Sequence, residues 1–236
     1  MKIEYAELLN RTNVVGVVTN YTDFQTARSS PLGQINILEL RADLWPFRFN
    51  DRSTQDLLSS QFPVIFTARN VHEGGKNKSW TIADRAELYR AYIPHVAFID
   101  IEASTAHELV DVIDEAKKAG VGVIISYHNL ETTPSYAELI CQGQICRSMG
   151  GDILKIAVKV LTLGDLVELE DSVSTLGHLF DFKVSAMAIG EPYGKISRFL
   201  DAITGGPFIY GYLSDEVVPG QPKASDIHRL LKELEQ

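Results

Sequence analysis

The sequence predicts an α/β fold, and within that class a (β/α)8 TIM barrel that comprises the whole chain, residues 1–236, as a single domain. Short β-branched runs alternate with longer amphipathic segments from end to end, and this order is typical of a parallel sheet. Eight such repeats in a chain of this length match the usual size of a closed barrel. An open doubly wound sheet is the competing architecture, but it usually has fewer strands and central strands that are apolar on both faces.

The expected strands are short runs rich in valine, isoleucine and other apolar residues. They lie at about 13–19, 35–41, 63–69, 96–102, 122–128, 153–158, 183–189 and 207–213. The segments between them carry apolar residues at helical spacing, which predicts helices. These helices are expected at about 53–60, 82–93, 105–118, 136–148, 163–179, 193–203 and 224–235, with a weaker pattern near 22–29.

Two of the expected helices carry a start signal of their own. Thr105 and Glu108 have the spacing of a capping box, and Gly120 would end the helix that follows them. Ser135 and Glu138 repeat the same spacing at the next helix along the chain. We therefore expect a hydrogen-bonded helix start at both places.

The strands divide into two unlike faces, because alternate side chains of a strand point to opposite sides of the sheet. In the run 154–158, Leu154 and Ile156 share an aliphatic face suited to packing under helices, whereas Lys155 belongs to the other face. Four earlier strands divide in the same way. Their polar faces carry Glu39 with Arg41, Thr67 with Arg69, Asp100 with Glu102, and Ser126 with His128. Solvation of a strand end explains one such case, but five indicate polar side chains gathered at the carboxyl-terminal mouth, where barrel enzymes perform their chemistry.

Composition and charge narrow the classes of function. The net charge of −9 argues against a nucleic-acid binder, which needs a basic face to neutralise phosphates. No run approaches the ~20 apolar residues of a membrane span, and the N-terminus lacks the pattern of a signal peptide. Cys141 and Cys146 are too few for a disulfide scaffold, which fits a reducing compartment. A cytoplasmic protein with no membrane partner is expected.

Lys155 is the first candidate for chemistry. Its strand is otherwise aliphatic, so we expect its amine to be removed from bulk water and to be uncharged. A neutral amine is the nucleophile that forms an imine with a ketone or aldehyde. The alternative is a structural lysine paired with a carboxylate such as Glu102.

His128 is the second candidate, at the end of the preceding strand and on the polar face. It is expected beside Lys155, across one strand spacing of about 4.8 Å, where an imidazole could move protons near neutral pH. The alternative for a single histidine is a hydrogen-bonded strand end. The other histidines lack metal-ligand spacing, so no zinc site is expected.

Arginines and one loop glutamine complete the candidate site. Arg41, Arg69 and Arg198 could bring positive charge to the mouth, since a guanidinium holds a carboxylate in two contacts. Gln221 lies in a Pro-Gly-Gln-Pro turn after the last strand, on a loop over the mouth. The Gly-Gly pair after Glu73 is a weak phosphate signal, because no complete phosphate-binding motif accompanies it.

With these residues in place, the chain resembles the type I 3-dehydroquinate dehydratases, the imine-forming class. The resemblance extends from Ile37 to Gln221 and keeps its order along the chain. Its anchors are Glu39-Leu40-Arg41, Phe66-Thr67-Ala68-Arg69 with Glu73-Gly74-Gly75, Ser126-Tyr127-His128-Asn129, Lys155-Ile156-Ala157-Val158, Ile196-Ser197-Arg198 and Pro219-Gly220-Gln221. Each anchor falls at an expected strand end or in the loop that follows, which makes the set specific.

The resemblance implies a lyase that dehydrates 3-dehydroquinate to 3-dehydroshikimate in the shikimate pathway of aromatic amino acid biosynthesis. It also implies a reaction with no metal, no nucleotide and no other cofactor. In it Lys155 forms the imine, or Schiff base, His128 is the general acid and base, and Glu73 orients His128. The implied substrate-binding residues are Glu39, Arg41, Arg69, Arg198 and Gln221. The resemblance also implies a homodimer, and some relatives are fused to shikimate dehydrogenase, so this chain could be one half of such a fusion.

The chain departs from the family pattern in three places, one of which is a slightly expanded Gly190–Gly194 loop. The family usually has a serine that contacts the substrate ahead of the Pro-Gly-Gln turn, and this chain has Val217 there. Val217 cannot donate that hydrogen bond, so we expect either that a neighbouring residue substitutes or that the loop binds somewhat differently. The segment before Asn13 is short, so the N-terminal hairpin that closes some family barrels is expected to be absent.

Two other functions remain compatible with the residues alone. One is another Schiff-base lyase of the aldolase or transaldolase type, which usually needs a phosphate site in the last strand–helix loops. The Gly205-Gly206 pair precedes the last strand, at the wrong end of the barrel for that site. The other is a non-catalytic barrel that binds an anion, and it predicts that Lys155 is salt-bridged and protonated.

Overall fold

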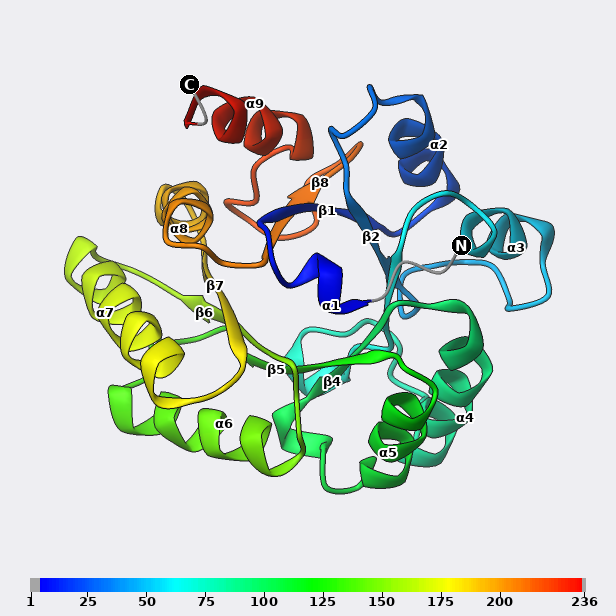
Figure 1. Cartoon of the computed structure of the whole chain (residues 1–236), viewed down its shortest axis with the longest axis horizontal. Coiled ribbons are helices and arrows are strands. Elements are labelled where there is room, and N and C mark those ends of the chain that lie inside the picture. Colours follow the sequence, from blue (N-terminus) through cyan, green and yellow to red (C-terminus); the bar gives the residue numbers. More distant parts are fainter. Residues whose placement is uncertain (1–4, 235–236) are drawn as a thin grey trace.

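The computed structural model describes residues 5–234, and in them eight parallel strands form one sheet. The strands are β1 (Asn13–Val18), β2 (Ile37–Arg41), β3 (Val64–Thr67), β4 (Phe98–Glu102), β5 (Gly122–Asn129), β6 (Ile153–Lys159), β7 (Lys183–Ile189) and β8 (Phe208–Tyr212). Each of β1 to β6 pairs with the next strand, and β8 pairs with β1. The expected (β/α)8 barrel is confirmed, and Figure 1 shows the strands enclosed by a ring of helices.

The helices follow the expected segments closely. They are α1 (Tyr5–Leu8), α2 (Tyr21–Ser29), α3 (Arg52–Leu58), α4 (Ile82–Tyr92), α5 (Val110–Lys118), α6 (Tyr136–Ser148), α7 (Leu163–Leu179), α8 (Tyr193–Ile203) and α9 (Ala224–Leu234). Three short 3₁₀ helices are η1 (Val71–Glu73), η2 (Ile93–His95) and η3 (Ala103–Thr105). No helix in the described part of the chain has the length and apolar character needed to cross a bilayer.

The two faces of the strands pack into two separate cores. Leu154 and Ile156 belong to the larger cluster between the sheet and the helices, as their parity predicts. Ile153 and Ala157 belong to the smaller cluster inside the barrel. The inner cluster extends from the floor of the barrel to residues that line the mouth, such as Met187. Polar side chains of the same parity lie beside its upper members, towards the carboxyl ends of the strands.

Helix α1 covers the amino-terminal end of the barrel, and Figure 1 shows it across the centre of the strand ring. Leu8 is buried in the inner cluster, and the Tyr5 ring meets Phe98 edge-on with 5.5 Å between centroids. The Tyr5 hydroxyl also donates to Asp152 (3.3 Å). From Tyr5 onward no strand precedes β1, so in the described residues a helix and not a hairpin covers this end of the barrel.

One of the two expected helix starts is wrong. Residues Ala103–Thr105 form η3, and α5 begins only at Val110 without a side-chain cap. The Thr105 hydroxyl instead accepts a hydrogen bond from Arg85 (3.2 Å), so a tertiary contact has taken the capping oxygen. The other capping box is confirmed, with Ser135 and Glu138 bonded reciprocally at the start of α6.

A seam between β7 and β8 interrupts the sheet. Among the described residues no strand ladder joins the two, and the Phe208 amide instead donates to the Ser185 hydroxyl (3.1 Å). Above the seam, the Gly190 amide of the β7–α8 loop donates to the Pro219 carbonyl of the β8–α9 loop (2.8 Å). A methyl group on Gly194 would lie 2.6 Å from the Gly220 carbonyl oxygen, so these two loops are in direct backbone contact.

Candidate active site

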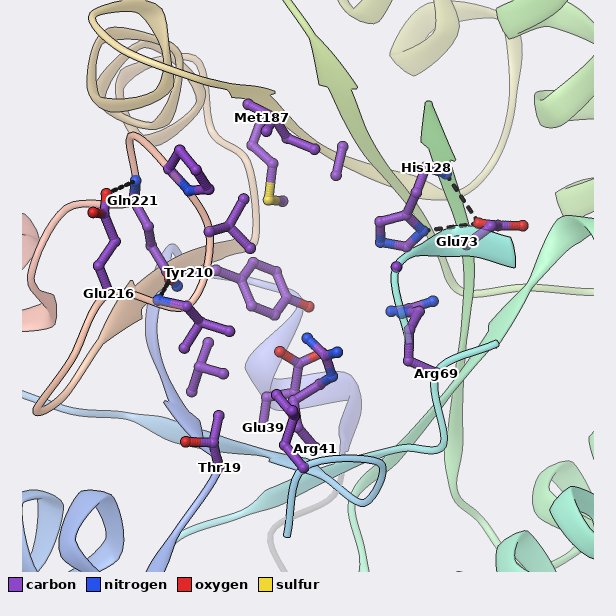
Figure 2. Close-up of a pocket in the computed structure, with 18 of the residues that line it drawn as sticks. Thr19, Glu39, Arg41, Arg69, Glu73, His128, Met187, Tyr210, Glu216 and Gln221 are labelled. Carbon is purple, nitrogen blue, oxygen red and sulfur yellow. Dashed lines mark hydrogen bonds and ion pairs between the residues drawn. The ribbon is translucent and has the colours of Figure 1, made fainter. Parts of the chain in front are cut away.

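A cavity of about 710 Å³ opens at the carboxyl ends of the strands. Its size is ordinary for a small-molecule site. Figure 2 shows Glu73 and His128 on one wall and Glu216 and Gln221 on the opposite wall, with Tyr210 between them. Every site residue expected from the sequence lines the cavity: Glu39, Arg41, Arg69, Glu73, His128, Lys155, Arg198 and Gln221.

Lys155 projects inward from β6 and is almost fully buried, as its parity predicts. Its Nζ lies 2.9 Å from Glu39 Oε1 on β2 and 3.0 Å from Asp100 Oδ2 on β4. Two buried carboxylates therefore face the nitrogen, where the sequence predicts an amine without a charged partner. The expected partner also differs, since Glu102 is engaged by Arg69 and Arg85.

Arg69 organises the charges beside the lysine. Its guanidinium holds Asp100 through two contacts (3.0 and 3.1 Å), and it also reaches Glu102 and the Ser126 hydroxyl. Burial acts to raise the pKa of Asp100, but Arg69 and Lys155 outweigh it and hold that pKa well below its usual range. Arg69, which lies just beyond the end of β3, thus stabilises the ionised carboxylate of Asp100 beside the reactive nitrogen. Asp100 in turn helps to place Lys155.

Glu73 fixes His128 in one orientation. Glu73 Oε2 accepts from the His128 backbone amide (3.0 Å) and lies 2.9 Å from Nδ1 of the same residue. The Ser104 hydroxyl donates to the other oxygen, Oε1 (2.6 Å). Donation from Nδ1–H to Glu73 leaves Nε2 as the basic nitrogen of the imidazole.

His128 is placed differently from the expectation. Across the β5–β6 ladder Lys155 is opposite Ser126, and His128 is opposite Ala157, one inward position nearer the mouth. The histidine therefore does not lie directly beside the lysine. Both side chains still face the same cavity, with His128 above Lys155 along the barrel axis.

Burial sets the protonation states of His128 and Glu73. It lowers the pKa of His128 well below 6.5, with help from the positive charges of Arg69 and Lys155. It raises the pKa of Glu73 to about 7, although the Ser104 hydrogen bond opposes the rise. The imidazole is therefore neutral at physiological pH and can accept a proton, and Glu73 titrates near neutrality.

Arg198 brings an unused donor to the cavity. Its Nη1 donates to the backbone carbonyls of Ala188 (3.0 Å) and Gly194 (2.7 Å), but its buried Nε has no partner. Burial lowers the pKa of Arg198 to about 10, which leaves it charged at neutral pH. A buried cation with a free donor is suited to an anionic group of a ligand.

Arg41 and Gln221 complete the rim. Arg41 lies in a two-pronged ion pair with Asp43, with both contacts at 2.9 Å, so its guanidinium is already oriented. Gln221 is buried, and its Oε1 accepts from the Val217 amide (3.3 Å). Glu216 Oε1 accepts from the Gly220 amide (2.7 Å), so the loop is held by its own side chains. Val217 packs on the inner cluster.

Sequence reasoning did not single out Tyr210 or Ser104, both of which contact candidate site residues. Tyr210 on β8 lines the cavity, and its ring lies 3.9 Å from Lys155 Nζ. Its inward parity with Phe208 could have indicated this position. Ser104, which bonds Glu73, lies in η3, where the sequence suggested only the start of a helix.

Comparison of this chain with known protein families agrees with the geometry of the site. A family model described as type I 3-dehydroquinase matches residues 15–236. The chain belongs to the type I 3-dehydroquinase family. The resemblance seen in the sequence is therefore confirmed, and the chain is a hydro-lyase of the shikimate pathway, which leads to the aromatic amino acids.

Individual relatives cover nearly the whole chain. The 3-dehydroquinate dehydratase of Thermococcus gammatolerans is 30% identical over 233 residues, which are 94% of this chain and 99% of that protein. A crystal structure of a type I 3-dehydroquinate dehydratase from Clostridium difficile, with covalently modified comenic acid, superimposes with a TM-score of 0.83 at 25% identity. That superposition covers 95% of this chain and 92% of the other.

Fusion to a second enzyme occurs among the relatives. The chloroplastic bifunctional 3-dehydroquinate dehydratase/shikimate dehydrogenase of Arabidopsis thaliana is 31% identical over 211 residues. These are 86% of this chain but 33% of that protein. The fold described here is therefore also used as one part of a longer protein.

Proposed function

We propose that this chain dehydrates 3-dehydroquinate to 3-dehydroshikimate through an imine on Lys155. The observation that carries the proposal is a buried lysine nitrogen in the same cavity as a neutral, oriented imidazole. An imine needs an amine shielded from water, and the elimination needs a base above it. Family membership supports the substrate, and the site geometry supports the route.

Imine formation starts with proton transfer from the Lys155 ammonium to Glu39, whose Oε1 is 2.9 Å away. The amine then attacks the ketone carbon of the substrate. The ketone oxygen takes one hydrogen from the nitrogen and the proton held by Glu39, and it leaves as water. A protonated imine with one N–H remains on Nζ. Asp100, held ionised by Arg69, keeps a negative charge beside the cation that forms.

The elimination then uses His128. Nε2 removes a proton from the carbon next to the imine carbon, and the electron pair moves into the positively charged imine to give an enamine. The enamine returns the electrons and expels the hydroxyl from the next carbon, which leaves as water with the proton carried by His128. Hydrolysis of the product imine consumes one water and restores Lys155.

Cations around the cavity would hold the substrate for these steps. Arg198 and Gln221 are proposed to bind the carboxylate, because the unpartnered Nε of Arg198 offers a charge-assisted hydrogen bond. Glu39, Arg41 and Arg69 line the cavity nearer β2 and β3, where ring hydroxyls could reach them. Fixed positioning of this kind supplies several kcal/mol of rate acceleration in enzymes.

Borohydride trapping tests the nucleophile and the substrate together. The protein is incubated with 3-dehydroquinate and borohydride, and intact mass and peptide mapping locate the adduct. We expect a reduced adduct on Lys155, together with formation of the conjugated enone product in untreated samples. Active turnover with no adduct would refute the imine, and absence of turnover in folded protein would refute the substrate.

Two variants serve as controls for the trap. Lys155→Ala should form no adduct, but it leaves two buried carboxylates without a cation and so costs stability, by about 3–5 kcal/mol for a broken buried pair. Lys155→Arg keeps the positive charge beside Glu39 and Asp100 but cannot form an imine. Loss of turnover in Lys155→Arg, with the thermal midpoint preserved, separates the chemical role of the amine from its structural one.

A further inference from the structure

The ring of Tyr210 faces the reactive nitrogen. The ring centroid lies 3.9 Å from Lys155 Nζ, which places the ammonium over the aromatic face. Tyr210 is 3% exposed and belongs to the cluster inside the barrel. The lysine nitrogen thus has three neighbours: the carboxylates of Glu39 and Asp100 and this ring. A desolvated contact of this kind is the strongest setting for a cation–π interaction.

The hydroxyl of Tyr210 plays no part in holding the side chain. Its oxygen is buried and has no hydrogen-bond partner in the described structure. Burial, together with Glu39 and Asp100, raises the pKa of Tyr210, so the phenol stays neutral. A buried hydroxyl without a partner is a cost to the folded state. The contacts that hold this side chain are therefore those of its ring, which meets both the inner cluster and the lysine nitrogen.

Imine formation changes what the nitrogen can donate. An ammonium carries three N–H groups, and in reacting with a ketone it gives two of these hydrogens to the water that leaves. One hydrogen and the positive charge stay on the nitrogen of the imine. Hydrogen bonds to both Glu39 and Asp100 then cannot persist, because a single N–H remains. A cation–π contact requires the charge and no particular N–H, so the ring can hold the nitrogen in both states.

We propose that Tyr210 is a positioning residue that keeps Lys155 Nζ against its aromatic face before and after the imine forms. This inference rests on the proposed imine chemistry of Lys155. It assigns the role to the electrons of the ring and not to the hydroxyl. The ring would stabilise the cationic imine, whose charge draws electrons from the carbon that loses its proton.

A series of substitutions at one position tests this role. Tyr210→Phe removes only the hydroxyl and should keep kcat within about twofold, because the aromatic face is retained. Progressively fluorinated phenylalanines at position 210 keep the ring shape but withdraw electrons from its face. We expect kcat to fall stepwise along the fluorinated series, by about five- to thirtyfold in total. Tyr210→Leu should be at least as slow as the most fluorinated variant.

The controls distinguish this role from packing. The same fluorinated residues at Tyr92, a buried ring stacked on Phe66 in the outer cluster, should leave kcat unchanged. Equal kcat across the fluorinated series at position 210 would overturn the inference and show that the ring only fills space. A large loss in Tyr210→Phe would overturn it in favour of the hydroxyl.

Trapping separates failure of this inference from failure of the proposed function. Borohydride adducts on Lys155 are measured in the wild-type protein and in each variant. No adduct in the wild type refutes the imine and the inference with it. A normal wild-type adduct, with turnover insensitive to fluorination, refutes the role of Tyr210 alone.

Discussion

Glu73 and His128 show how one residue sets the working pH of another. The neutral imidazole needs an acceptor at Nδ1 to keep Nε2 basic, and an ionised carboxylate strengthens that base. Burial raises the pKa of Glu73 to about 7 but lowers that of His128 well below 6.5. Glu73 is then the group whose ionisation falls in the physiological range, and activity should rise as pH increases through about 7.

Glu73→Gln tests this assignment. The amide oxygen still accepts from Nδ1–H, but it carries no charge at any pH, like the protonated form of Glu73. We expect kcat/KM to lose its rise near pH 7 and to stay about tenfold below the wild-type plateau. A pH–rate profile measured from pH 5 to 9 checks this; persistence of the rise in the variant would assign it to another group.

Arg198 is expected to act mainly in binding. Its free Nε and its charge suit a carboxylate, and a charge-assisted hydrogen bond contributes about 1.5–3 kcal/mol. Arg198→Met keeps much of the side-chain length and should raise KM about ten- to hundredfold with a smaller effect on kcat. Steady-state kinetics with 3-dehydroquinate measure both, and an unchanged KM would place the carboxylate elsewhere.

Single residues also show where sequence reasoning stops. The alternation of faces along β6 correctly predicts that Lys155 points inward, because parity is a local property of a strand. It does not identify the partners, since the long side chain reaches Glu39 and Asp100 on other strands across the barrel. The same limit explains why Tyr210, which contacts the lysine from β8, was not found.

At the scale of elements, two similar sequence signals have different outcomes. Ser135 and Glu138 form their capping box at a helix start exposed to solvent, where no other group competes for the hydroxyl. The equivalent signal at Thr105 fails because the buried Arg85, bonded to Glu102, takes that hydroxyl. Local spacing predicts a cap well where the surroundings are solvent, and poorly where a buried charge lies nearby.

The seam between β7 and β8 offers an element-scale test. The Phe208 amide is buried and depends on the Ser185 hydroxyl, since no ladder supplies a partner there. Ser185→Ala should lower the free energy of unfolding by about 1–3 kcal/mol, the cost of an unsatisfied buried donor. Urea denaturation measures this, with Ser148→Ala on the exposed end of α6 as a matched control that should change little. Equal stability of both variants would mean that the amide finds another partner.

At the scale of the whole molecule, the barrel followed from the order of segments. Every expected strand and helix has a counterpart in the described residues, because alternating strand and helix patterns leave few parallel-sheet topologies. The order of segments does not show how the barrel closes, either between β7 and β8 or at its amino-terminal end. Neither the seam nor the use of α1 as a cover over the barrel floor could be predicted, since both depend on how the strand ends meet in space.

Substitution of Leu8 tests whether α1, as the cover of the barrel floor, contributes to stability and not to catalysis. It is fully buried in the inner cluster, far along the chain from the residues at the mouth. Leu8→Ala should lower the free energy of unfolding by about 2–5 kcal/mol, as for other large-to-small changes in a core. Activity of the folded fraction at low temperature should be retained, because α1 lies at the opposite end from Lys155. A loss of kcat without loss of stability would contradict this separation.

The interrupted sheet also bears on how a ligand enters and leaves. The helix that carries Arg198 and the loop that carries Gln221 stand on opposite sides of the seam, yet their loops are joined by the bond from Gly190 to Pro219. Together they form one wall of the cavity mouth, opposite the wall that carries His128. Because this hydrogen bond links the two loops, neither loop can move away from the cavity alone without breaking it.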